Sequence, residues 1–158
     1  LKSVLSDINN IFTMKLTLEF VSLVSNILNV DSETYKKIKE SVLETKPSAN
    51  GFDIEIADAI NIVAEVKCNI PVNGGNTYGA AQRTGIMKDI DSLLNGKTKS
   101  PINTSSCFKF MVLLDTPEIR KATIKYLNTL DKYKEKIVYL DNKTPIDTNN
   151  VYVVFVEL

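Results

Sequence analysis

The sequence predicts an α/β domain in which a central mixed β-sheet is flanked by helices and preceded by an N-terminal helical pair. With 158 residues, the chain is long enough for a single core of two or three layers. Hydrophobic residues make up 44% and charged residues 24%, as is typical of globular domains. Segments with helical and strand periodicity alternate along the chain. We therefore expect one domain over residues 1–158, with helices in 1–46 and the α/β core in 50–158.

Two helices are predicted before the core. Residues 14–29 carry apolar side chains at spacings of three and four, as an amphipathic helix does. Asp31 or Ser32 can cap the start of a second helix that runs to about Thr45. Residues that favour turns then end this helix: Pro47, Ser48, Asn50 and Gly51.

The segment 51–69 has a period of two and predicts a β-hairpin with one charged face. Its apolar residues fall mainly at even positions, and the charged ones at odd positions: Asp53, Glu55, Glu65 and Lys67. Two antiparallel strands that share a core face must then pair residues whose numbers sum to an even value. Such a register places Asp53 or Glu55 opposite Glu65, and it requires a connection of odd length around residues 58–60.

Two further helices and three strands are predicted after the hairpin. Residues 108–114 are almost all apolar, as in a central strand covered on both faces. Thr116, Pro117 and Glu118 supply an N-cap, a first-turn proline and a first-turn acid for a helix. The predicted segments are a polar loop at 70–77, a helix at 78–94, a polar loop at 95–106, a strand at 108–114, a helix from 116 onward, and strands at 136–140 and 151–156.

The composition excludes several kinds of chemistry. Nineteen basic residues balance nineteen acidic ones, so any DNA contact must be local. The chain has no histidine, which excludes His-based catalytic triads and His-metal sites. Cys68 and Cys107 have no neighbouring cysteine and are expected to be reduced, buried thiols. No apolar run approaches the length that spans a bilayer, and we expect a cytoplasmic protein.

Asp53 and Glu65 predict a metal site on the hairpin. Two carboxylates brought together on one sheet face repel each other unless a cation lies between them, and such oxygen ligands suit Mg²⁺ or Mn²⁺. Lys67 beside them can position or help to deprotonate a metal-bound water, and the carbonyl of Val66 can add an oxygen ligand. The alternative is a solvated sheet face on which these charges are only neighbours.

The residues that carry this pattern resemble the motif of the PD-(D/E)xK nuclease superfamily: Asp53, then Glu65-Val66-Lys67 at the end of an apolar strand, then a helix that carries Gln82. The resemblance implies a restriction-endonuclease-like core, Mg²⁺-dependent cleavage of double-stranded DNA, and a homodimer. It favours the endonuclease of a restriction system. A Holliday-junction resolvase, a DNA-repair nuclease and a noncatalytic DNA- or protein-binding module with the same fold stay open as alternatives.

The same resemblance assigns roles to the individual residues. It implies that Asp53 and Glu65 are metal ligands and that Lys67 is the catalytic lysine. Gln82 would orient water or phosphate, unless it is a surface amide.

Further candidates lie outside this central set. An additional acid from the helix before the hairpin would be Glu40, with Glu44 as second choice, and Asp58 is another candidate ligand unless it only stabilises the hairpin turn. Basic residues that follow the hairpin are candidates for phosphate contacts with DNA. They are Arg83, Lys88, Lys97, Lys99 and Lys109.

Overall fold

The computed structural model describes residues 1–45, 51–57 and 59–158 of the chain. Five strands form one sheet: β1 (Ile54–Ile56), β2 (Ile62–Lys67), β3 (Phe108–Leu114), β4 (Ile137–Tyr139) and β5 (Val151–Val156). Their order across the sheet is β1-β2-β3-β5-β4. β1 runs antiparallel to β2, whereas every other neighbouring pair is parallel. The predicted α/β fold with a mixed sheet is therefore confirmed.

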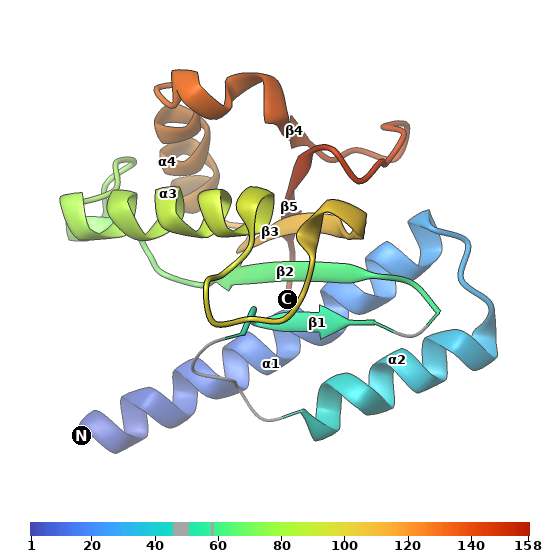
Figure 1. The fold of residues 1–158 in the computed structure, drawn as a ribbon. Helices are drawn as coiled ribbons and strands as arrows, with labels where there is room; N and C mark the ends of the chain where they lie inside the picture. The colour runs from blue at the N-terminus through green and yellow to red at the C-terminus, as the bar shows by residue number, and fades with distance from the viewer. Residues whose placement is uncertain (46–50, 58) are drawn as a thin grey trace.

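Helices cover both faces of the sheet (Figure 1). On one face lie α1 (Lys2–Ile27) and α2 (Ser32–Glu44), and on the other lie α3 (Ala80–Asn95) and α4 (Pro117–Leu127). Phe20 of α1 meets Phe110 of β3 edge to face, with ring centroids 5.1 Å apart. Ile90 of α3 packs in the opposite cluster with Met111 of β3. The sheet is thus the middle layer of three.

Helix α1 begins at Lys2, well before residue 14, where the sequence predicted it to begin. Its second half packs on the sheet through buried residues such as Leu16 and Val24. Its first half extends away from the sheet in Figure 1 and exposes apolar side chains: Val4, Leu5, Ile8, Ile11 and Phe12. The prediction followed the stripe that packs on the core, and the helix continues past that stripe.

The hairpin has the predicted parity. Ile54 pairs with Ala64 and Ile56 with Ile62, so partner numbers sum to 118, an even value. The connection covers residues 57–61, which is an odd length. Regular pairing of β1 begins only at Ile54 because the Asp53 side chain takes the next main-chain donor: Val66 N–H donates to Asp53 Oδ2 at 2.8 Å.

The other predicted elements form with small changes at their ends. Asp31 Oδ1 accepts from Thr34 N at 2.9 Å and caps α2, while Thr116 Oγ1 accepts from Ile119 N at 3.2 Å and caps α4. α3 starts two residues later than predicted, at Ala80. Three short 3₁₀ segments lie in the connections: η1 (Val72–Gly74), η2 (Thr104–Ser106) and η3 (Asp131–Lys136).

Some predictions concern residues elsewhere in the chain. The turn residues Pro47, Ser48 and Asn50 and the candidate ligand Asp58 lie outside the described residues.

Both cysteines are free thiols, with Cys107 buried and Cys68 half-buried. Among the helices described here, none combines the length and the apolar character needed to cross a membrane.

Candidate active site

Glu65 and Lys67 lie on the face of β2 that α3 covers. Alternate residues of a strand share a face, and Val63, two residues before Glu65, packs in the same cluster as Ile86 and Ile90 of α3. Glu65 is consequently only 3% exposed. The alternative of a solvated charged face is wrong for Glu65, because a helix and the loop after it cover this part of the sheet.

Asp53 completes a pair of carboxylates with Glu65. Extending the hairpin register by one position beyond the Ile54–Ala64 pair places Asp53 opposite Glu65, and the Val66 N–H bond fixes the Asp53 side chain beside β2. Burial raises the pKa of Glu65 to about 8; Lys97 opposes this shift, and the nearby Asp53 carboxylate adds to it. The structure therefore brings together the two carboxylates that the sequence predicted as metal ligands.

Lys67 is paired with an acid that the sequence analysis did not select. Its Nζ lies 2.6 Å from Oδ2 of Asp89, a residue of α3 whose side chain is only 18% exposed. Burial lowers the pKa of Lys67, but the contact with Asp89, together with the charges of Asp53 and Glu65, outweighs burial and the pKa lies above its ordinary value. Burial raises the pKa of Asp89, and Lys67 offsets part of that shift. Lys67 is therefore held as a charged donor.

Lys97, predicted as a DNA contact, points into the site instead. Its Nζ forms an ion pair with Glu65 Oε1 at 2.5 Å and donates to the carbonyl of Gly51 at 2.6 Å. It also lies 4.7 Å from the centroid of the Phe52 ring. Lys97 thus belongs to the group around Glu65 and is not a freely exposed phosphate contact.

Gln82 and Glu40 have other contacts than those predicted for them. Gln82 Oε1 accepts from Gly79 N at 3.0 Å and its Nε2 donates to Ile70 O at 2.8 Å, so the amide joins the start of α3 to the loop that follows β2. Glu40 is exposed on α2 and pairs with Lys36 at 3.9 Å on the same helix. The structure does not bring Glu40 into the group formed by the hairpin and α3, and its second choice Glu44 is also exposed.

The remaining candidates for DNA contact divide into two classes. Arg83, Lys88 and Lys99 are exposed, as a phosphate contact requires. Lys109 is only 2% exposed and donates to Cys107 O at 3.0 Å and to Thr148 O, so its prediction as a DNA contact is wrong. The reason is its place on the central strand β3, where neighbouring strands and the segment before β5 enclose it.

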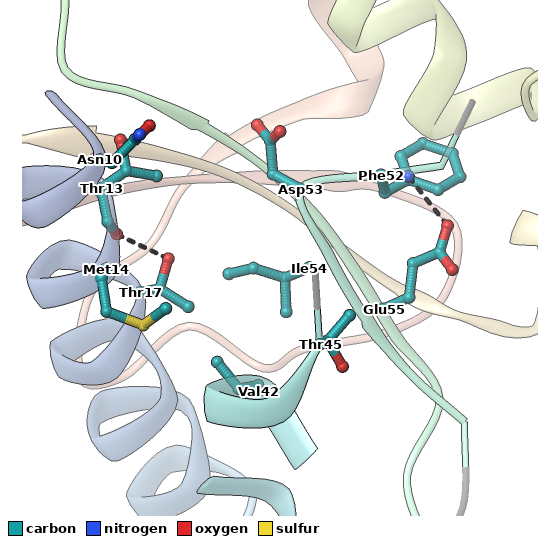
Figure 2. A pocket seen from close by; sticks show the side chains of 10 residues that line it. All are labelled: Asn10, Thr13, Met14, Thr17, Val42, Thr45, Phe52, Asp53, Ile54 and Glu55. Atoms are coloured by element: carbon teal, nitrogen blue, oxygen red, sulfur yellow. Dashed lines mark hydrogen bonds between the residues drawn. The ribbon is translucent and has the colours of Figure 1, made fainter. Parts of the chain in front are cut away.

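Two cavities adjoin the candidate site. One, of about 330 Å³, lies between α1, α2 and β1, with Asp53 on its rim. Figure 2 shows the Asp53 carboxylate pointing away from Met14 and Val42, while Glu55 folds back to accept from Phe52 N at 2.8 Å. Glu55 thus caps its own strand. The other cavity, of about 220 Å³, is lined by Lys67, Asn69, Tyr78, Ala81, Gln82, Gly85 and Ile86.

Asp53 and Glu65 are the carboxylates that could hold a divalent cation, with the Val66 carbonyl next to them in the main chain. The described part of the chain contains no group of three or more His, Cys, Asp or Glu side chains arranged to hold a metal ion. Mg²⁺ commonly keeps several waters and binds through one or two carboxylates. The donor set therefore fits Mg²⁺ or Mn²⁺ held by two carboxylates and water, rather than an all-protein cage.

Comparisons with protein-family models, with curated proteins and with solved structures found no match to this chain. The geometry around Asp53, Glu65 and Lys67 is therefore the basis for any function assigned to this chain.

Proposed function

We propose that this chain is a divalent-metal-dependent endonuclease with a PD-(D/E)xK-like site and a restriction-endonuclease-like core, acting on double-stranded DNA in a restriction system. One observation carries the proposal. The carboxylates of Asp53 and Glu65 lie side by side, and Lys67 occupies the next position on the same face of β2. Two oxygen-ligand side chains beside an ammonium group suit hydrolysis of a phosphodiester bond. The homodimer that the resemblance implies stays a prediction.

Each residue of the site would have a different role in hydrolysis. Asp53 and Glu65 would hold Mg²⁺, which when bound lowers the pKa of a coordinated water and neutralises charge on the phosphate. Lys67, whose pKa lies above its ordinary value, would donate from its ammonium group to a phosphate oxygen rather than act as a base. The cavity beside Lys67 gives that phosphate room to approach. Arg83, Lys88 and Lys99 would contact other phosphates of the strand.

Removing the amine of Lys67 tests this proposal. The Lys67→Ala variant is expected to lose divalent-dependent cleavage of duplex DNA by at least about a hundredfold, while circular dichroism shows an unchanged fold. Lys121→Ala is the matched control, because Lys121 is exposed on α4 and should be replaceable without effect. Cleavage retained by folded Lys67→Ala protein would refute the assignment.

A noncatalytic DNA-binding module with the same fold is the second candidate. The observation that favours it is the ion pair between Lys97 and Glu65, which already supplies one predicted metal ligand with a positive charge. Calorimetric titration with Mn²⁺ separates the two candidates. A nuclease should bind Mn²⁺ and lose that binding in Asp53→Asn, whereas a noncatalytic module should show no binding that depends on Asp53.

A further inference from the structure

The loop after α3 is built to deliver Lys97 to Glu65. α3 ends at Asn95, and Gly96 follows with φ +86° and ψ 167°, a region that is essentially restricted to glycine. The Lys97 carbonyl accepts from Ser100 N at 2.9 Å, which closes the turn on its other side. The chain thus reverses directly at Lys97 and carries its side chain back toward the hairpin.

Three contacts hold the Lys97 ammonium group in one place. They are the 2.5 Å ion pair with Glu65 Oε1, the 2.6 Å hydrogen bond to Gly51 O, and the face of the Phe52 ring at 4.7 Å. Carboxylate oxygen, carbonyl oxygen and an aromatic face all favour a cation. Lys97 therefore occupies a cation site of its own, on the side of Glu65 that faces Gly51.

The third carboxylate of the site is also occupied by a lysine. Asp89 Oδ2 lies 2.6 Å from Lys67 Nζ, so a metal ion could use Asp89 only by breaking that ion pair. Asp53, Glu65 and Asp89 supply three negative charges, and Lys67 and Lys97 supply two positive ones, for a sum of −1 with Glu65 deprotonated, the form in which a carboxylate binds metal. One divalent cation and one phosphodiester, at +2 and −1, bring this sum to zero. A second divalent cation would leave an excess charge of +2 next to Glu65, whose side chain is only 4% exposed.

We infer that Lys97 is a built-in cation of the active site, that it stays on Glu65 when metal binds, and that the site takes one divalent cation per chain rather than two. This inference rests on the proposed nuclease function, because the second cation is the one that would otherwise assist phosphodiester cleavage. Lys97 acts through Glu65 and is a positioning residue. Its ammonium group supplies positive charge that a second metal ion would otherwise provide.

The test is a Mn²⁺ titration of the whole chain, monitored by isothermal titration calorimetry. The kcat for duplex cleavage is measured separately at saturating Mn²⁺. The wild type should bind one Mn²⁺ per chain. Lys97→Met, which keeps the length of the side chain but removes its charge, should bind Mn²⁺ at least about tenfold more tightly and yet show kcat reduced at least about tenfold. Lys97→Arg should keep one ion and most of the activity. Lys121→Met, an exposed lysine of α4 with no role in the site, should behave as the wild type.

The outcomes separate this inference from the proposed function. Two Mn²⁺ ions per wild-type chain would overturn it, as would Lys97→Met with unchanged Mn²⁺ affinity. Lys97→Met that cleaves as fast as the wild type at saturating Mn²⁺ would show that Lys97 only occupies the metal position, and this also overturns it. If Lys97→Met does not fold, the number of Mn²⁺ ions bound by the wild type and by Lys97→Arg, and the activity of Lys97→Arg, still decide whether the inference holds. A wild type that binds one Mn²⁺ but cleaves no DNA contradicts the nuclease function instead.

Discussion

Lys67 and Asp89 form an ion pair that links β2 to α3, with a nitrogen–oxygen distance of 2.6 Å. Burial alone would lower the pKa of Lys67, and the contact with Asp89 raises it, with further contributions from Asp53 and Glu65. Asp89 therefore acts through Lys67 and keeps it charged. A lysine held in this state can donate to a phosphate oxygen throughout the neutral pH range.

Replacing Asp89 with asparagine should lower the pKa of Lys67, because burial then acts against the ammonium form with less opposition. If cleavage needs protonated Lys67, the alkaline limb of kcat should move to lower pH and kcat should fall at least about tenfold. The measurement is kcat against pH from about 7 to 10.5 at saturating Mg²⁺. Asp91→Asn is the matched control, since Asp91 lies on the same helix but accepts from Tyr133 Oη at 2.6 Å. Folded Asp89→Asn protein with an unmoved alkaline limb would contradict this role.

Two of the acids in the site differ in how far the sequence could reveal them. Glu65 could be placed because strand periodicity fixes its face relative to apolar neighbours. Asp89 is not among the candidates drawn from the sequence, although it follows Ile86 by three residues and precedes Leu93 by four, and both of those are buried. Residues at these spacings share a helix face. That signal could have placed Asp89 inward.

Neither Lys97 nor Lys109 could be placed by periodicity. The direction of Lys97 depends on the turn at Gly96, and no repeat in the surrounding polar segment encodes that turn. Lys109 lies in an apolar run whose period is hidden because both faces of β3 are buried. Its amine donates to the nearby Cys107 O and to Thr148 O, a carbonyl group distant in sequence that strand periodicity cannot reveal.

At the scale of elements, the hairpin could be predicted more fully than the helix that begins the chain. Apolar residues at even positions in both strands fixed the parity of the register, and the pairing of Ile54 with Ala64 confirms it. The start of α1 could not be predicted from core periodicity, because its first half has exposed apolar side chains rather than a buried stripe. The length of β1 could not be predicted either, because the Asp53 side chain takes the place of a main-chain hydrogen-bond acceptor for Val66 N–H.

The start of α3 gives a prediction about Gln82. Its amide joins Gly79 N and Ile70 O, so Gln82→Ala should destabilise the protein by about 1–2 kcal/mol through two lost hydrogen bonds. The kcat of Gln82→Ala, measured well below its melting temperature, should stay within about threefold of the wild type. Urea unfolding and cleavage kinetics on the same preparation measure both quantities. A hundredfold loss of kcat at unchanged stability would instead restore the catalytic role predicted from the resemblance.

At the scale of the whole molecule, the three-layer arrangement could be predicted from alternating helical and strand periods. The order of strands could not, because β5 lies between β3 and β4 and that choice depends on how the connections cross the sheet. The arrangement matters for the site. Packing α3 over β2 buries Glu65, brings Asp89 to Lys67, and sets the loop that returns Lys97 to the hairpin.

The proposed function requires that Asp53 and Glu65 hold a divalent cation beside Lys67. The most direct measurement is the anomalous difference density of a crystal soaked in Mn²⁺. We predict one peak per chain between the carboxylates of Asp53 and Glu65, with Lys97 still paired to Glu65, and no such peak in Asp53→Asn. A soaked wild-type crystal without Mn²⁺ between these two carboxylates would contradict the claim.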